Sequence, residues 1–214
     1  MPYTEDLFID RASQRQRSIQ SIMPRWYSPI DRHRMEPEYT YGFRLYENAR
    51  RGTLGILVLG DESIRSDETL LANLGATSVE PTAAASDAIV GDNARLRRLR
   101  GAVLNERFWW PFFNDCWVLG GIHGGAEFHL GFSAWPDDSA LWDGRNRRPT
   151  MLGRELFILS LAGYEIVNEG VLGLVFRCRN PNRAADFELS EIYDGHIGQD
   201  RGAFIDNLRA AFGP

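Results

Sequence analysis

The chain has 214 residues, of which 43% are hydrophobic and 12% aromatic, and its formal net charge is −5 at pH 7. This composition excludes a disordered chain, because enough apolar surface is present to bury a core. No apolar run reaches the roughly 18 residues that a membrane-spanning helix needs. The acidic balance also argues against nucleic acid as a partner, because phosphate requires a positive surface.

All 24 basic residues other than histidine are arginines, and the chain contains no lysine. A mechanism that needs a lysine amine is therefore excluded. Codon bias is the simpler explanation, and escape from ubiquitin attachment in a eukaryotic cytosol is the alternative. No basic start followed by an apolar stretch opens the sequence, so we expect a cytoplasmic protein, with export independent of a signal peptide as the alternative. In that compartment, Cys116 and Cys178 are expected to be free thiols.

Residues 1–38 are expected to form an N-terminal helix and a connector that precede a single α+β domain at 39–214. A weak apolar stripe predicts the helix over residues 5–22. Closely spaced prolines after it are typical of an irregular connector.

Three hairpins are predicted from strand-like runs joined by turn residues. Alternating aromatic residues predict a strand over 39–45, which a turn joins to the apolar run 54–60. The stretch 116–132 contains two apolar runs joined at Gly124-Gly125, a pair that suits a tight turn. The third hairpin and one further strand are expected at 164–179 and 186–193.

Helices are predicted where capping residues coincide with a helical spacing of apolar residues. Thr150 is expected to cap a core helix that ends at Gly163. Because hairpins account for the strand pairing, the predicted fold class is α+β, an antiparallel sheet built from three hairpins with helices packed on one side. The expected helices of this domain lie at 66–75, 92–104, 149–163 and 199–212.

The stretch FWWPFFNDCWVLGGIHGG at 108–125 suggests a thiol enzyme with Cys116 as its nucleophile. A thiolate nucleophile needs a base within hydrogen-bond reach. If both residues lie on one strand, His123 is roughly 23 Å from Cys116, whereas the returning strand brings His129 back towards it. His129 is therefore the expected base, and His196 is the alternative.

The Cys116-Trp117 pair resembles the Cys-Trp pair of papain-like peptidases. In those enzymes the cysteine opens a long helix, which lowers its pKa, whereas a strand is expected here. A buried core thiol is the simpler interpretation. Glu127 and His129 are expected to share a face of the hairpin, with His123 on the opposite face. Two such ligands do not make a metal site, and none is expected.

A second enzymatic hypothesis is ADP-ribosyl transfer, for which NAD would be the cofactor. Enzymes of that class place an arginine on an early strand, a serine on a middle strand and a glutamate near the end of the chain. Here Arg44, Ser133 and Glu188 or Glu191 occur in that order. The resemblance is one of order, because the glutamate spacing departs from the pattern and a Ser-Thr-Ser run is absent from the sequence.

Aromatic residues are concentrated between positions 108 and 142. Most are expected in the core, because aromatic side chains bury a large area. Neighbouring residues of any regular element face different ways, so the Trp109-Trp110 pair is difficult to bury completely. An exposed aromatic side chain here would serve as a binding hot spot. The candidate binding residues are Trp109, Trp110, Phe112 and Trp135.

The segments NDCWVLGGIHGGAEFHL, LWDG and GRELFILSLAGYE lie within residues 105–165. This part of the chain resembles small uncharacterised bacterial proteins found near polymorphic toxins and contact-dependent secretion systems. The resemblance implies a bacterial protein that binds a protein partner in a toxin–immunity or secretion-effector setting, without a cofactor. The alternative is a secreted enzymatic effector, whose reacting groups are either Arg44, Ser133 and Glu191 or the pair Cys116 and His129.

Overall fold

The computed structural model describes residues 2–22, 36–51, 56–59, 69, 72, 109–130, 135–145, 147–170, 173–194 and 200–213. Two of the expected helices lie outside these ranges. The helix expected at 92–104 does so entirely, and the one expected at 66–75 does so except for residues 69 and 72. The described helices are α1 (Glu5–Ile22), α2 (Glu36–Arg50), α7 (Trp109–Gly124), α8 (Asp138–Leu141), α9 (Met151–Leu161), α10 (Pro181–Asp186), α11 (Leu189–Asp194) and α12 (Arg201–Phe212). The strands are β1 (Ile56–Leu59), β2 (Glu127–Leu130), β3 (Trp142–Asp143), β4 (Arg148–Pro149), β5 (Tyr164–Gly170) and β6 (Gly173–Cys178).

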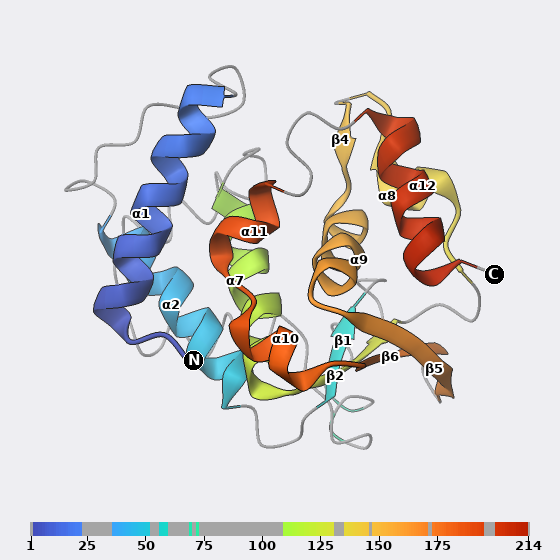
Figure 1. Cartoon of the computed structure of the whole chain (residues 1–214), viewed down its shortest axis with the longest axis horizontal. Coiled ribbons are helices and arrows are strands. Elements are labelled where there is room, and N and C mark those ends of the chain that lie inside the picture. The colour runs from blue at the N-terminus through green and yellow to red at the C-terminus, as the bar shows by residue number, and fades with distance from the viewer. Residues whose placement is uncertain are drawn as a thin grey trace.

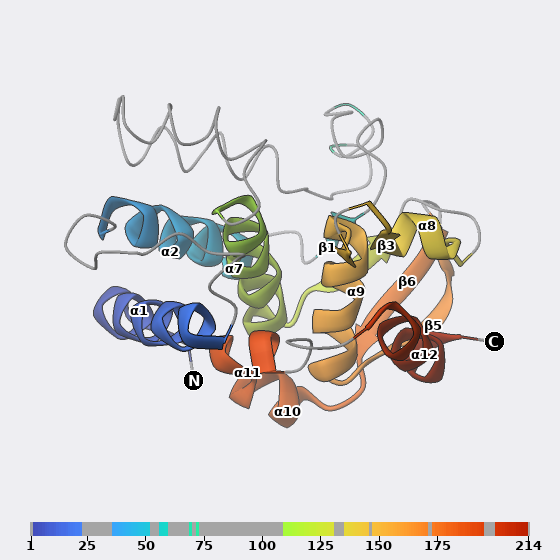
Figure 2. The same cartoon turned by 90° about the horizontal axis from the view of Figure 1, so that it is seen from above.

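The larger sheet of the described chain has the strand order β1-β2-β6-β5. Strand β1 is parallel to β2, whereas β2 and β6, and β6 and β5, are antiparallel pairs. Strands β3 and β4 form a separate antiparallel pair. Helices mixed with largely antiparallel strands confirm the α+β class. Helices α1, α2 and α7 lie on one side of the molecule, and the larger sheet lies with α9 and α12 on the other (Figures 1 and 2).

One face of the larger sheet contributes aromatic side chains to the core. Phe128 and Phe176 are paired across β2 and β6, and both are fully buried. Trp117 of α7 makes an edge-to-face contact with Phe128, and Phe212 of α12 does the same with Phe176. Helices α7 and α12 therefore cover this face. Side chains alternate along a strand, so Glu127 and His129 of β2 lie on the opposite face.

Helix α7 is buried over residues 112–122 and packs closely against α2. A Cβ atom on Gly120 would lie 2.1 Å from the carbonyl oxygen of Tyr46. Glycine at this position is therefore what lets the two backbones approach. The close packing continues at Gly124, where a Cβ atom would lie 2.6 Å from the carbonyl oxygen of Arg50.

Two of the three predicted hairpins are wrong, because the segments 39–45 and 116–122 belong to helices α2 and α7. Aromatic and branched residues in both segments favoured strands. A helix that is buried on nearly all sides has no polar face, so the helical period disappears from its sequence. The strand expected at 186–193 is also wrong, since helix α11 occupies most of it.

The remaining elements agree with the sequence. Helices α1, α9 and α12 and the hairpin β5–β6 are present as expected. The Thr150 hydroxyl accepts a hydrogen bond from the backbone N–H of Gly153 at 3.0 Å, which confirms the predicted cap. Gly163 ends the helix with φ +81°. None of the described helices combines the length and the apolar character required to cross a membrane.

Candidate functional site

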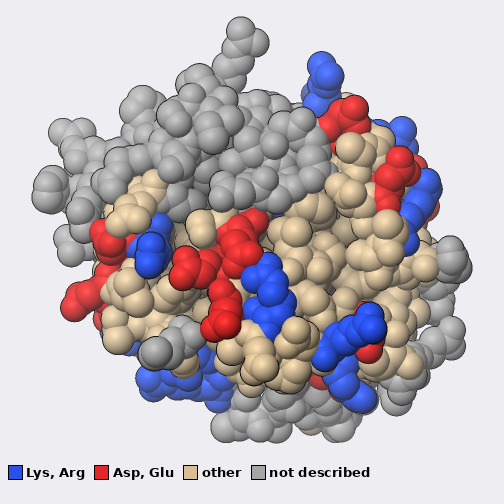
Figure 3. Space-filling model, viewed as in Figure 1, with Lys and Arg blue, Asp and Glu red and all other residues tan. Residues whose placement is uncertain are grey.

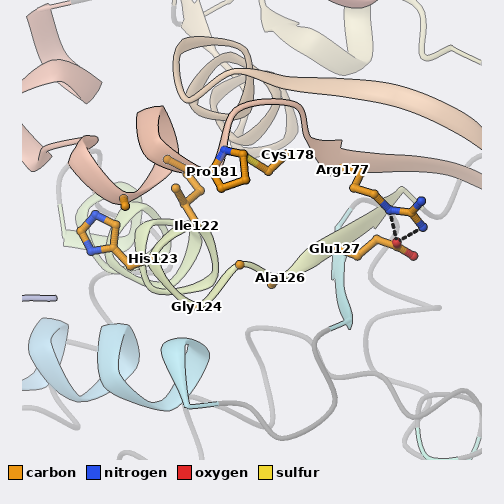
Figure 4. A pocket seen from close by; sticks show the side chains of 11 residues that line it. Ile122, His123, Gly124, Ala126, Glu127, Arg177, Cys178 and Pro181 are labelled. Carbon is orange, nitrogen blue, oxygen red and sulfur yellow. Dashed lines mark hydrogen bonds and ion pairs between the residues drawn. The ribbon is translucent and has the colours of Figure 1, made fainter. Parts of the chain in front are cut away.

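A surface pocket of about 470 Å³ lies where the end of α7 meets β2, β6 and α10. We call it the α7–β6 pocket. Most of its lining consists of small and apolar residues, and its charged side chains, Glu127 and Arg177, come from the two strands (Figure 4). The principal lining residues are Ile122, His123, Ala126, Glu127, Arg177, Cys178, Pro181 and Ala184.

The pocket exists because α7 stops abruptly and the chain turns into β2. Gly125 has φ +70°, a conformation that glycine adopts without steric cost. Its N–H donates to the carbonyl of Ile122 at 3.1 Å, and the N–H of Ala126 donates to the carbonyl of Gly121 at 2.9 Å. These two bonds form a Schellman motif, which satisfies carbonyls at a helix end. The glycine pair predicted as a hairpin turn is thus a helix stop.

Glu127 and Arg177 form an ion pair at the strand side of the pocket, and the imidazole of His129 contacts the same carboxylate. His129 Nε2 lies 2.7 Å from Glu127 Oε1, and Arg177 Nε donates to Glu127 Oε2 at 2.8 Å. Burial raises the pKa of Glu127, but the hydrogen bonds from Arg177 and His129 outweigh it, so this pKa lies below its usual value. The carboxylate is therefore ionised at neutral pH and holds the imidazole in place. The prediction that Glu127 and His129 share a face is confirmed.

His123 lies at the opposite end of the pocket from the Glu127–Arg177 pair (Figure 4). Its Nε2 lies 2.8 Å from the carbonyl oxygen of Phe187, and its Nδ1 lies 2.8 Å from the hydroxyl of Tyr46. Burial is the main reason that the pKa of His123 lies below its usual value. Both ring nitrogens are thus engaged by the fold. The expectation that His123 lies on a strand is wrong, since it belongs to the last turn of α7.

Cys116 is fully buried in the interface between α7 and α2. Its Sγ lies 3.1 Å from the position that a Cβ on Gly42 would occupy. In a helix, Cys116 and His123 are two turns apart, about 10 Å along the axis rather than the 23 Å expected of a strand. Cys116 also lies two turns after the start of α7, so it does not open a helix as a papain-like nucleophile does. The structure does not bring it to His129, whose imidazole contacts Glu127 instead.

The residues of the ADP-ribosyl transfer hypothesis are not arranged on strands. Arg44 lies on α2, with its guanidinium 3.6 Å from the carboxylate of Glu5. Glu191 lies on α11, where Oε1 accepts hydrogen bonds from Arg183 Nη1 at 3.1 Å and from the backbone N–H of Glu188 at 2.9 Å. Ser133, like the alternative base His196, lies outside the described residues.

Of the candidate binding residues, Phe112 and Trp135 pack inside the described fold. Phe112 is fully buried, with its ring 6.0 Å from that of Tyr39. Trp135 is half-buried and its ring lies 6.0 Å from that of Phe212. Phe112 is therefore a core residue, whereas Trp135 keeps part of its surface accessible. Trp109 and Trp110 begin α7, and their side chains lie outside the described part of the structure.

Sequence reasoning did not single out Arg177 or Cys178 as site residues. Arg177 interrupts an apolar strand, which is the signal that its side chain points away from the core. Its partner Glu127 is 50 positions away, and only the strand order β2-β6 brings the two together.

Within the described residues, no group of three or more His, Cys, Asp or Glu side chains is arranged to hold a metal ion. No protein-family model, curated protein or solved structure matches this chain.

Proposed function

We propose that this chain acts by binding another protein. The observation that carries the proposal is that three of the described candidate catalytic side chains, those of Cys116, Arg44 and Glu191, serve the fold itself. Cys116 fills the α2–α7 interface, Arg44 joins α2 to α1, and Glu191 joins α11 to α10 through Arg183. Substrate would have to displace contacts that hold helices together.

The proposed biological setting is bacterial toxin–immunity or secretion, and it rests on the resemblance of residues 105–165. A binding protein of this kind needs no cofactor, and NAD belongs only to the ADP-ribosyl transfer alternative. The absence of lysine from the sequence is compatible with either setting.

The test is an affinity purification of the tagged full chain from cells that encode it, with an unrelated acidic protein of similar size as the control bait. We expect one partner in stoichiometric amount, which must then form a complex with the purified chain in calorimetry. If no protein binds the purified chain, the proposal fails.

A second candidate function is hydrolysis, favoured by the His129–Glu127 pair beside the α7–β6 pocket. A carboxylate that holds one imidazole nitrogen leaves the other free to act as a base, as in the Ser-His-Asp arrangement. Expression toxicity separates the two functions. If the chain arrests its host, and His129→Gln or Glu127→Gln abolishes this while Arg179→Gln does not, the chain is an enzyme and the binding proposal is wrong.

A further inference from the structure

We infer that the exposed arginines between strands β3 and β4 form a docking surface for an acidic segment of a protein partner. This inference rests on the proposed binding function and names the chemistry of the partner. We call the segment from Trp142 to Pro149 the arginine hairpin. It contains the run Gly144-Arg145-Asn146-Arg147-Arg148, in which three of five residues are basic and none is acidic.

The base of the arginine hairpin is fixed to the core. Trp142 is buried, and its ring lies 5.4 Å from that of Phe204 on α12. Beyond β4, the Thr150 hydroxyl donates to the carbonyl of Ala140 at 2.6 Å, and the N–H of Thr150 donates to the carbonyl of Leu141 at 3.1 Å. These contacts fix the two ends of the turn, so less backbone has to become ordered when a partner binds.

Two guanidinium groups at the tip have no carboxylate partner among the described residues. Arg145 and Arg147 are exposed and make none of the ion pairs seen elsewhere. The arginines of α12 differ from these two, because Arg201 and Arg209 both form ion pairs with Asp138, at 3.2 and 2.7 Å. In Figure 3 basic and acidic side chains alternate over α8 and α12, and a basic side chain projects beyond them at the edge above β4.

Arg147 also has φ 52°, and it is the only residue other than glycine with a positive φ in the described part of the chain. A side chain in this region carries steric strain that glycine does not. Glycine would suit the backbone better, so the arginine side chain is present at a cost to the fold. Strain of this kind is a recognised property of functional sites.

The size of the positive region selects the class of partner. A long polyanion such as nucleic acid needs an extended positive surface, whereas this chain has a net charge of −5. Asp143 stands opposite Arg148 in the β3–β4 pair, so the positive region ends at the base of the hairpin. A spot of this size suits one or two carboxylates, and guanidinium groups bind carboxylates in a bidentate manner.

The test measures binding of a fluorescent glutamate-rich peptide to the full chain by anisotropy at low ionic strength. Arg145→Gln/Arg147→Gln should weaken binding about fivefold or more, the loss expected of two exposed ion pairs. The matched control is Arg11→Gln/Arg179→Gln, which removes the same charge from two exposed arginines elsewhere and should leave affinity unchanged.

Arg147→Gly separates binding from folding. It should weaken peptide binding while the melting temperature stays constant or rises by about 2 °C, because the backbone strain is relieved. A fall in melting temperature together with unchanged binding would show that Arg147 serves the fold alone.

Three outcomes would overturn the inference: no peptide binding, equal losses in the hairpin and control variants, or tighter binding of an oligonucleotide through the same arginines. If a stoichiometric protein partner binds the wild-type chain and the Arg145→Gln/Arg147→Gln variant equally well, the inference is wrong while the proposed function stands. If no protein partner binds at all, it is the proposed function that fails.

Discussion

The hydroxyl of Tyr46 lies 2.8 Å from Nδ1 of His123 and joins helices α2 and α7. A carbonyl oxygen can only accept a hydrogen bond, so the contact of Nε2 with Phe187 places the proton on Nε2. Nδ1 is then the acceptor and Tyr46 donates to it. The same hydroxyl accepts the N–H of Tyr3 at 3.1 Å, and the Tyr3 hydroxyl accepts the N–H of Leu189 at 3.3 Å. One directed network thus ties the N-terminal segment, α2, α7 and α11 together.

The first prediction concerns pH. Burial lowers the pKa of His123 in the folded chain below its ordinary value of 6.5, so the unfolded chain binds the proton more readily. The stabilising effect of neutral His123 is therefore complete above pH 6.5 and is lost as the pH falls through the folded-state pKa. Protonation would also place an N–H on Nδ1, against the hydroxyl that donates to it.

Urea unfolding between pH 8 and pH 5 measures this effect. The urea concentration at the midpoint should fall with acidification. This dependence of the midpoint on pH should be weaker in His123→Asn, which has no imidazole to titrate. Tyr164→Phe is the control, because burial raises the pKa of this tyrosine and it does not titrate in this range, so the variant should retain the wild-type dependence on pH. If the midpoint depends on pH equally in the wild type and in His123→Asn, His123 is not the group whose protonation lowers stability.

A second prediction follows from the hydroxyl of Tyr46. Tyr46→Phe leaves both Nδ1 of His123 and the N–H of Tyr3 without their partner inside the core. We expect the free energy of unfolding to fall by about 1–3 kcal/mol, the usual cost of buried groups left unsatisfied. Burial also raises the pKa of Tyr46 to about 12, and absorbance titration should show one late-ionising tyrosine fewer in the variant.

Tyr164→Phe provides the comparison, because its buried hydroxyl donates only to the carbonyl of Ala126 at 3.0 Å. Its loss of stability should be smaller than that of Tyr46→Phe. If the two variants lose the same stability, the network has no importance beyond that of a single buried hydrogen bond.

The sequence predicted those elements whose signals are local. Thr150 and Gly163 mark the two ends of α9, and hydrogen bonding and a positive φ confirm both. Local signals did not predict the type of an element that is buried on nearly all sides. Cys116 lies in a run of apolar and aromatic residues with no polar face, and such a run has no period from which helix and strand can be distinguished.

The candidate site was predictable only within one strand. Glu127 and His129 are two residues apart, so alternation alone placed them on one face. Arg177 reaches Glu127 because β6 lies between β2 and β5, an order that pairs strands distant in sequence. The engagement of His123 depends in the same way on Tyr46, 77 positions away. Contacts of this kind depend on tertiary packing, which the sequence pattern does not contain.

A third prediction concerns the contact between α2 and α7. Gly120→Ala would place a Cβ atom 2.1 Å from the carbonyl oxygen of Tyr46, so the helices must move apart. Backbone displacement in a packed core typically costs about 1–3 kcal/mol or more. Gly144→Ala is the control, because no atom lies within 4 Å of its Cβ position. Thermal unfolding should show a large loss for the first variant only, and equal melting temperatures would argue against the close approach.

The last prediction concerns a buried ion pair between α7 and α9. Arg154 Nε donates to Asp115 Oδ1 at 2.8 Å and Nη2 donates to Oδ2 at 2.6 Å, with Asp115 fully buried. Arg154→Leu removes the guanidinium that faces this buried carboxylate and should cost about 3–5 kcal/mol. The double variant Asp115→Leu/Arg154→Leu removes both charges, so it should be more stable than Arg154→Leu alone. Denaturant unfolding of the wild type, both single variants and the double variant measures the coupling between the two side chains. If the losses of the single variants simply add in the double variant, the two side chains are not energetically coupled and the pair does not hold α7 to α9.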